Sequence, residues 1–318
     1  MNGIPLTFDE RQLNRTVVGG YANNSPEALN ISVILLNTSG SHFKVQLFEN
    51  LMSCNFREIV SVEHDANNFA LDDLLKRFPN IKFIVPLEKA TDGEMINLAM
   101  SEVTSDYVLV LRDNLNIPSG IILSNLAEKL TKDGIYCVVP RLVDSKHSGL
   151  VTQFAPGVNK NHFLVEGSSF VKDNSKSLYP FDYIALYNRK KFIQLGGFDY
   201  TIKSPYWQNL DLAVRSWLWG EETKITTILQ FSYTYESLIE DKTANIDYIR
   251  FHLKNEYPKF KNDRGVLRKS QFFSFFLHSG CGYLEARRQF YAARKWVEAN
   301  KYRFKTDLTT LVEGWRVN

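Results

Sequence analysis

The chain has 318 residues, of which 44% are hydrophobic, enough to bury a large core in one globular domain or one and a half. Its 38 basic and 35 acidic side chains nearly balance, which argues against a nucleic-acid-binding protein. The three cysteines are dispersed, so neither a disulfide framework nor a structural zinc site is indicated, and a reducing compartment is expected. No stretch reaches the roughly 18 apolar residues of a spanning helix, and the beginning of the chain lacks a signal-peptide pattern, so a cytoplasmic protein is predicted.

The first 29 residues are polar and show no sustained period, which predicts an N-terminal extension before the first regular element at Ile31. After it come short, β-branched and nearly continuous apolar runs, typical of strands that are buried on both faces. These runs are ISVILL (31–36), EIVSV (58–62), IKFIV (81–85), DYVLVL (106–111) and IYCVV (135–139).

Helical patterns alternate with these strands, at residues 43–51, 96–103 and 122–130. The alternation predicts an α/β fold with a doubly wound, mostly parallel sheet, in which ligands bind beyond the carboxyl ends of the strands. Further along, the sequence predicts loops or hairpins at 144–180, a helix at 189–195 that ends at two glycines, a helix at 208–219, a strand at 224–231 and a helical C-terminal region at 239–318.

Glycine-rich nucleotide motifs are missing from the sequence: neither GxGxxG nor GxxxxGK[ST] occurs, which argues against a nicotinamide dehydrogenase and a P-loop NTPase. Polar side chains instead follow the first two strands, namely Asn37 and Ser39, then Glu63 and Asp65. Such groups can accept hydrogen bonds from a base or a ribose, although each alone is more typical of a solvated loop.

Two blocks of sequence carry a family resemblance. In the first, EIVSVEHD (58–65) is followed by SDYVLVL (105–111) and then by Arg112, Asp113 and Asn114. The second block is LYNRKKFIQLGGFDYTIKSPYWQNLDLAVRSWLWGEE, residues 186–222. Together they resemble family 2 glycosyltransferases of the GT-A fold, within the nucleotide-diphospho-sugar transferase superfamily. The resemblance implies a GT-A-like domain at residues 30–238.

The resemblance implies transfer of a sugar from a nucleoside diphosphate donor to an acceptor hydroxyl in glycan synthesis, usually with inversion. One carboxylate removes the acceptor proton, and Mg²⁺ or Mn²⁺ stabilises the departing diphosphate. Carried over by position, Glu63 faces the base or ribose and Asn97 lines the donor cleft. The remaining correspondences place Arg112, Asp113 and Asn114 at the family's Asp-x-Asp position, and Gln208 and Asn209 at its acidic pair.

The motifs of this chain depart from the family pattern. A metal site at Asp113 and Asn114 would have a single charged oxygen ligand, because Arg112 replaces the first aspartate. The amide of Asn209 cannot act as a general base. Asp211 is not an easy substitute, since two residues along a helix turn a side chain by about 200°.

Two functions are compatible with these departures. In the first, the enzyme needs no metal: Arg112, helped by Arg189 or Lys190, neutralises the diphosphate, and Asp182 or Asp199 takes the proton. In the second, the chain is an inactive pseudoenzyme that acts as a binding or scaffold subunit of a glycan-synthesis assembly.

The acceptor is expected to be a glycan, a lipid-linked sugar or a protein, with Trp207 and Gln208 on the acceptor side. The C-terminal region contains a phenylalanine cluster, SQFFSFFLHSG (270–280), next to Arg264, Arg268 and Lys269. This cluster predicts peripheral contact with the inner face of a membrane, packing against the main domain, or a homo-oligomer.

Overall fold

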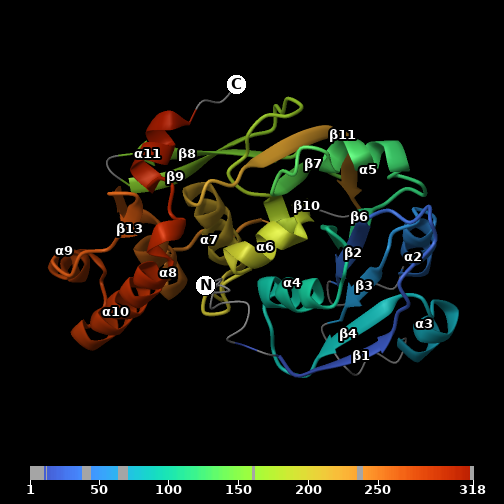
Figure 1. The fold of residues 1–318 in the computed structure, drawn as a ribbon, viewed down its shortest axis with the longest axis horizontal. Helices are drawn as coiled ribbons and strands as arrows, with labels where there is room; N and C mark the ends of the chain where they lie inside the picture. Colours follow the sequence, from blue (N-terminus) through green and yellow to red (C-terminus); the bar gives the residue numbers. More distant parts are fainter. Residues whose placement is uncertain are drawn as a thin grey trace.

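The computed structural model describes residue 11 and residues 13–37, 44–63, 71–159, 162–234 and 239–315. In this part of the chain a nine-stranded sheet forms the centre of the molecule (Figure 1). Its strands, in spatial order, are β1 (Arg15–Gly19), β4 (Lys82–Pro86), β3 (Ile59–Val62), β2 (Ile31–Leu36), β5 (Tyr107–Arg112), β10 (Ala185–Asn188), β7 (Cys137–Val143), β11 (Thr223–Tyr233) and β6 (Leu115–Asn116).

Most of this sheet is parallel, as the alternation of strands and helices predicts. Strands β4, β3, β2 and β5 are parallel to one another, and β7 is parallel to β11. Because β10 is antiparallel to both β5 and β7, the two parallel groups point the same way. Only β1, β10 and β6 run against that direction among the strands of the described sheet. The predicted α/β class is therefore confirmed.

The strand register aligns the carboxyl ends of three neighbouring strands. Every residue of β2 and β5 is buried, as expected for continuous apolar runs. Leu36 is level with Val62 of β3 on one side and with Arg112 of β5 on the other. The polar residues that follow each strand therefore meet at one edge of the sheet, where the topology of an open α/β sheet places ligands.

Helices α2 (Lys44–Met52), α3 (Leu71–Arg77), α4 (Asp92–Ser101) and α5 (Ser124–Thr131) connect the strands of the first half. Helix α6 (Arg189–Leu195) ends at Gly196, whose φ of 89° is the left-handed conformation expected from the Gly-Gly pair. Helix α7 (Pro205–Leu218) begins three residues before the predicted start, because Pro205 occupies its first turn, where a missing N–H costs nothing.

Regular structure begins earlier than the predicted Ile31. Strand β1 pairs with β4 through the register Val17 to Ile84 at the edge of the sheet. The sequence did not reveal it because an edge strand of five residues, largely exposed, carries no buried apolar period. The segment predicted as loops or hairpins contains the antiparallel pair β8 (Gln153–Asn159) and β9 (His162–Ser168).

The C-terminal region is mainly helical, with α8 (Ile246–Phe251), the π-turn η2 (His252–Glu256), α9 (Gln271–His278), α10 (Tyr283–Asn300) and α11 (Leu308–Gly314). A short hairpin, β12 (Lys259–Lys261) and β13 (Arg264–Val266), interrupts it. The region has a core of its own, in which Phe272, Phe275 and Phe290 are buried, whereas Phe273 is exposed. None of the described helices combines the length and the apolar character that a membrane crossing requires.

Candidate functional site

A buried polar cluster lies just beyond β2 and β3. The Asn37 amide donates to the Ser61 hydroxyl (2.9 Å), to the Val62 carbonyl (2.7 Å) and to Glu63 Oε1 (3.0 Å). Lys44 Nζ, on the first residue of α2, lies 2.6 Å from Glu63 Oε2. Because both charged side chains are almost fully buried, the pair holds the two strand ends and α2 in one fixed arrangement.

A second cluster is centred on Arg112 at the end of β5. Its Nε and Nη2 donate to Asp182 Oδ1 at 3.0 and 2.6 Å, and Nη2 also donates to Asp92 Oδ2 at 2.6 Å. Asp182 belongs to the 3₁₀ turn η1 (Phe181–Tyr183), and Asp92 is the first residue of α4. The Tyr233 hydroxyl, at the end of β11, donates to Asp182 Oδ2 at 3.1 Å. Two separate segments thus contact one guanidinium, and a third, β11, contacts Asp182.

Burial and charge act in opposite directions on this cluster. Burial alone would lower the pKa of Arg112, but the facing carboxylates of Asp182 and Asp92 raise it above its ordinary value. For Asp182, burial is the largest effect and raises its pKa, and Arg112 offsets part of that rise. The carboxylate of Asp92 is more accessible, with 20% of its side chain exposed against 4% for Asp182.

The backbone beside Arg112 is strained. Asp182 and the next residue, Tyr183, have φ angles of 52° and 63°, in the left-handed region that L-residues rarely adopt. An aspartate tolerates this conformation, but each such residue costs of the order of 1 to 3 kcal/mol, and strain of this kind concentrates at functional sites. The strain here positions the Asp182 carboxylate against the guanidinium.

The residues at the Asp-x-Asp position do not fit a divalent cation. Across the described residues, no three His, Cys, Asp or Glu side chains come together in a way that could hold a metal. The two carboxylates that approach this point, Asp92 and Asp182, face a guanidinium nitrogen 2.6 Å from each. Asp113 and Asn114 follow directly, and the main-chain carbonyl of Asn114 accepts a hydrogen bond from Thr234. Fixed positive charge therefore occupies the centre of the acidic groups.

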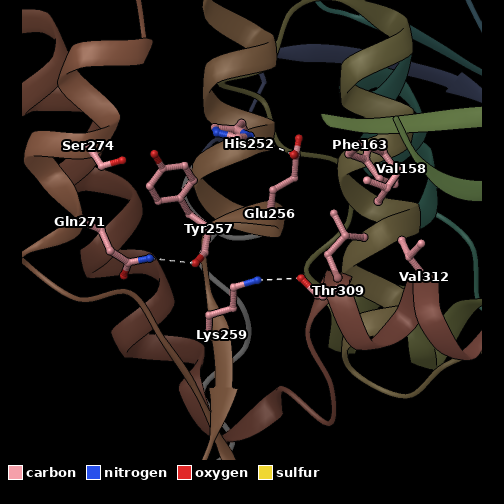
Figure 2. A pocket seen from close by; sticks show the side chains of 11 residues that line it. Val158, Phe163, His252, Glu256, Tyr257, Lys259, Gln271, Ser274, Thr309 and Val312 are labelled. Carbon is pink, nitrogen blue, oxygen red and sulfur yellow. Dashed lines mark hydrogen bonds and ion pairs between the residues drawn. The ribbon is translucent and has the colours of Figure 1, made fainter. Parts of the chain in front are cut away.

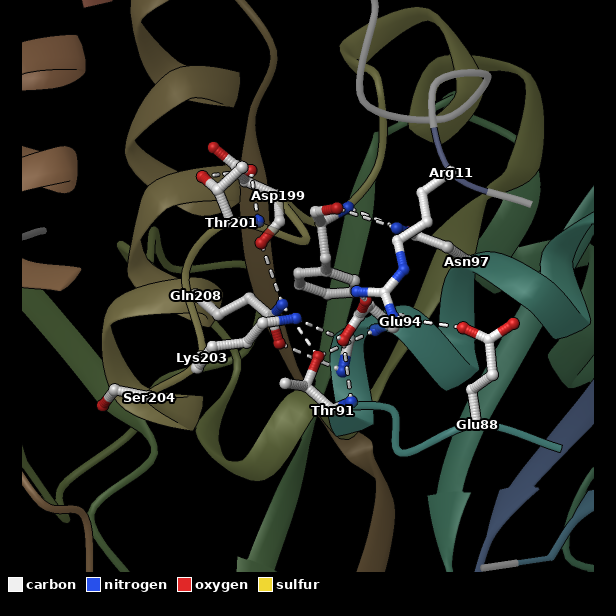
Figure 3. A network of polar contacts seen from close by, with 12 residues as sticks. Arg11, Glu88, Thr91, Glu94, Asn97, Asp199, Thr201, Lys203, Ser204 and Gln208 are labelled. Atoms are coloured by element: carbon white, nitrogen blue, oxygen red, sulfur yellow. Dashed lines mark hydrogen bonds and ion pairs between the residues drawn. The ribbon is translucent and has the colours of Figure 1, made fainter. Parts of the chain in front are cut away.

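Gln208, predicted on the acceptor side, is a completely buried residue of α7 that contacts the beginning of α4. Its amide nitrogen donates to the Thr91 hydroxyl (2.9 Å) and to the Asp199 carbonyl (3.0 Å), while its oxygen accepts from the Gly93 N–H (3.2 Å). Figure 3 shows this network, in which Thr91 and Glu94 also form the capping box of α4. In this arrangement Gln208 positions the beginning of α4, and with it Asp92.

Asn97 and Asn209 also bond to the main chain. Asn97 donates to the Phe198 carbonyl (2.7 Å) and accepts from the Phe198 N–H (2.9 Å), which fastens α4 to the Gly-Gly-Phe-Asp turn (Figure 3). Asn209 donates to the Pro180 carbonyl at 2.7 Å, two residues before Asp182. Both amides thus hold segments that surround the Arg112 cluster, and a direct contact of either one with substrate stays a prediction.

Asp199 and Asp211 share Lys254 as a neighbour. Lys254 Nζ contacts Asp199 directly and lies 3.7 Å from Asp211 Oδ1. Burial would raise the pKa of Asp199, but Lys254 and the Thr201 hydrogen bonds lower it to about 2. Asp211, fully buried, pairs with Arg215 at 3.1 Å and accepts from Asn255 at 2.8 Å.

Trp207, predicted to stack on an acceptor sugar, is packed among aromatic rings. Its indole N–H donates to the Thr243 carbonyl at 2.9 Å, and its ring lies within 5.5 Å of the centroids of Tyr206, Tyr248 and Phe251. Only 8% of the residue is exposed. Ser39 and Asp65, the other predicted donor ligands, lie outside the described residues, so their roles remain predictions.

The expectation that Arg189 supports Arg112 is wrong. Arg189 begins α6 beside the amino end of β5, where its N–H donates to the Asp106 carbonyl and its Nε to the Met100 carbonyl. Because β10 is antiparallel to β5, this point lies at the opposite end of the strand from Arg112. Lys190 follows Arg189 in the same helix.

Three residues of the site were missed in the sequence: Asp92, Tyr233 and Lys44. A capping box, Thr91 with Glu94, marks the start of α4 in the sequence and could have drawn attention to Asp92 between them. The other two carry no local signal, because Tyr233 reaches the cluster through strand pairing and Lys44 through the docking of α2.

Comparisons with known proteins identify the fold. No protein-family model and no curated protein matches the chain. Among solved structures it is similar to GalNAc-T7 with UDP, GalNAc and Mn²⁺, with a TM-score of 0.55 and 11% identity over 75% of this chain and 51% of the other. The chain thus spans about half the length of that protein. A mannosyltransferase from Pyrobaculum calidifontis, PcManGT with GDP-Man and Mn²⁺, aligns with a TM-score of 0.44 and 11% identity over 92% of this chain and 79% of the other. The chain has the GT-A glycosyltransferase fold.

Proposed function

We propose that this chain is a glycosyltransferase that moves a sugar from a nucleoside diphosphate donor to an acceptor hydroxyl. The fold makes this class the first choice, but fold alone does not determine function. The observation that carries the proposal is the convergence of Arg112, Asp92 and Asp182 beside the aligned ends of β2, β3 and β5. A strained backbone and buried charges at the ligand-binding edge of an α/β sheet are costly unless they serve a site.

In this proposal Glu63 and Asn37 face the base or ribose of the donor, and Lys44 fixes the Glu63 carboxylate. The guanidinium of Arg112 stabilises the negative charge that develops on the leaving diphosphate. Because guanidinium pairs well with phosphate oxygens, it can supply the charge that a cation supplies elsewhere in such chemistry. Among the described residues the carboxylates near Arg112 face a guanidinium and form no cluster that suits Mg²⁺ or Mn²⁺, and we therefore propose a metal-independent reaction.

For the acceptor proton, Asp92 is the best-placed base. It lies 2.6 Å from Arg112, and its side chain is more exposed than that of Asp182. Asp199 is a poorer choice, since its pKa of about 2 makes it a weak base. In the proposed step the acceptor oxygen bonds to the anomeric carbon as the bond to the diphosphate breaks, and the acceptor proton passes to Asp92. A single displacement of this kind inverts the anomeric configuration.

Calorimetry with UDP and GDP, each with and without Mn²⁺, tests the donor site. We expect binding that does not depend on Mn²⁺ and that weakens about tenfold or more in Arg112→Lys, which keeps one charge but loses the planar fork. Arg77→Lys, in an exposed pair with Glu49, is the matched control and should bind like the wild type.

Three outcomes separate the alternatives. Binding that requires Mn²⁺ would contradict the metal-independent mechanism. Nucleotide binding without donor hydrolysis or transfer would favour the inactive pseudoenzyme, and no nucleotide binding at all would refute the donor site. If transfer is found, the anomeric configuration of the product by NMR tests inversion, and activity that survives Asp92→Asn would show that another group is the base.

We further propose that residues 30–238 form the transferase domain and that the C-terminal region, 239–318, places it on an anionic membrane surface where a lipid-linked acceptor would lie. Phe273 and Leu277, one turn apart on α9, are 71% and 77% exposed, and Leu284 in the first turn of α10 is 78% exposed. Arg268 and Lys269, also exposed, precede α9. An exposed apolar patch next to basic side chains is complementary to an anionic lipid surface.

Flotation with phosphatidylglycerol vesicles tests this contact. The wild type should float, and the double variant Phe273→Ser with Leu277→Ser should not. Phe170, which is 85% exposed on a different part of the surface, gives the control variant Phe170→Ser, which should float like the wild type. Wild-type protein that does not float but dimerises in a concentration-dependent way would instead assign the patch to a homo-oligomer.

A further inference from the structure

A cavity of about 440 Å³ lies away from the strand ends, between residues 199–201, the α8–η2 segment and α10. Its charged lining consists of Arg250, Lys254, Arg288, Lys295 and Asp199, and Trp296 forms an aromatic wall. This volume falls within the range of small-molecule sites, roughly 300 to 1,000 Å³.

The lining has an excess of positive charge. Lys254 neutralises the lone carboxylate, Asp199, through a direct ion pair. The low pKa of Asp199, about 2, is consistent with a positive environment, although burial alone would have raised it. Lys295 makes no ion pair with any residue of the described chain. Arg250 and Arg288 are paired, at 3.2 and 3.1 Å, with Asp247 and Glu285, neither of which lines the cavity.

The cations differ in exposure: some are held in place at the base of the cavity, and others lie at its solvent-exposed opening. Lys254 is buried and lies 4.5 Å from the centre of the Trp296 ring, while Arg250 also donates to the Thr201 carbonyl. Arg288 and Lys295 are exposed, with 71% of the Arg288 side chain accessible. Fixed cations can recognise an anionic group without reorganising, and exposed ones can close over it.

A second cavity, on the other side of η2, provides a contrast. It has a volume of about 330 Å³ and lies among η2, α9, α11 and the β8–β9 pair (Figure 2). There His252 faces Glu256 at 3.0 Å, and Lys259 donates to the Thr309 hydroxyl at 2.7 Å. Because its charged groups are balanced, this cavity does not favour a ligand of either sign.

We propose that the cavity at Lys254 and Lys295 binds a sugar phosphate, with the phosphate between the cations and the sugar ring against Trp296. Phosphate oxygens match lysine and arginine donors, and an aromatic wall suits the apolar face of a sugar ring. This site is separate from the donor site at Arg112, and the inference does not depend on the proposed transferase activity.

Calorimetry with glucose 1-phosphate, inorganic phosphate and glucose as probes tests the site. We expect glucose 1-phosphate to bind the wild type, inorganic phosphate to bind more weakly and glucose not to bind. The double variant Arg288→Gln with Lys295→Gln should weaken glucose 1-phosphate about tenfold or more, because it removes both cations at the mouth. Lys129→Gln with Lys132→Gln, an equal loss of charge at exposed positions in and after α5, is the control.

The outcomes are decisive in either direction. No binding of glucose 1-phosphate to the wild type, or equal binding to the two double variants, would overturn the proposal. Equal affinity for inorganic phosphate would refute the contact with Trp296. Unchanged UDP binding in the Arg288→Gln, Lys295→Gln variant would confirm that the cavity is distinct from the donor site. If the variant lost affinity for UDP and glucose 1-phosphate alike, the two ligands would share one site and the assignment would be refuted.

Discussion

Replacing Arg112 by methionine tests the physical basis of the strand-end cluster. Methionine keeps much of the length of the side chain but removes three hydrogen bonds and the charge that faces Asp182 and Asp92. Since Asp182 is almost fully buried, the variant leaves an uncompensated carboxylate inside the protein. Breaking a buried ion pair in this way costs about 3 to 5 kcal/mol. We therefore expect Arg112→Met to lower the free energy of unfolding by that amount at pH 8.

The loss should depend on pH. Burial already raises the folded-state pKa of Asp182 above its unfolded value, and removal of Arg112 takes away the charge that opposes the rise. A carboxyl with a raised folded pKa binds a proton more readily in the folded state, so stability increases as the pH falls through that pKa toward the unfolded value. Each pH unit below the folded pKa, and above the unfolded one, recovers up to about 1.4 kcal/mol. The deficit of Arg112→Met should thus shrink between pH 8 and pH 5.5.

Urea unfolding of the wild type, Arg112→Met, Asp182→Asn and the double variant at pH 8 and pH 5.5 measures these effects. The double variant removes both charges and should recover about 2 kcal/mol or more of the loss at pH 8. Arg77→Met, in an exposed pair with Glu49, should cost no more than about 1 kcal/mol. A double variant no more stable than Arg112→Met, or a deficit that does not change with pH, would refute the reasoning.

Three further predictions concern the surrounding structure. Gly93→Ala should lower the free energy of unfolding by about 1 to 3 kcal/mol, because the new Cβ would come within 2.6 Å of the Gln208 side chain. The control is Gly314→Ala: this residue is also helical, but a Cβ there would meet no neighbouring atom of the described chain, so the change should be neutral or stabilising. The ionised Asp199 carboxylate stabilises the wild type by about 2 kcal/mol above about pH 4, and this stability is lost as the pH falls toward 2. Asp199→Asn should lack it, so the urea unfolding curves of the two proteins should differ at neutral pH and converge in acid. UDP-glucose should bind more tightly as the pH falls through the folded-state pKa of Asp182, which burial raises, since protonation removes a negative charge near the diphosphate; the same slope in Asp182→Asn by calorimetry would contradict this.

The sequence predicted the six parallel strands of the central sheet because each has a recognisable local pattern. Continuous β-branched runs mark buried parallel strands, and parallel strands bring their carboxyl ends to one edge. For this reason the positions of Asn37, Glu63 and Arg112 at a common edge could be predicted before any coordinates were known. The antiparallel strands of this sheet were not predicted: β1 is largely exposed, and β6 and β10 have only two and four residues.

The partners of the site residues could not be predicted in the same way. Arg112 meets Asp182 across 70 positions of the chain, and Gln208 meets Thr91 across 117. Contacts over such separations depend on how helices dock on the sheet, and local sequence patterns do not predict that docking. Arg189 illustrates the same limit, since its distance from Arg112 follows from the antiparallel direction of β10.

The charges at the strand ends favour the proposed functional origin of the cluster over a purely structural one. Arg112 carries one positive charge and faces two carboxylates, so with all three ionised the group is net negative. A buried ion pair stabilises a protein little more than apolar residues of the same size, and an additional carboxylate together with two left-handed residues makes the arrangement costly. Stability alone gives no reason to keep such a group at the ligand-binding edge of the sheet. The proposed transferase site would offer a fixed cation to a diphosphate and a carboxylate to an acceptor hydroxyl, and such a site would account for Arg112, Asp92 and Asp182 together.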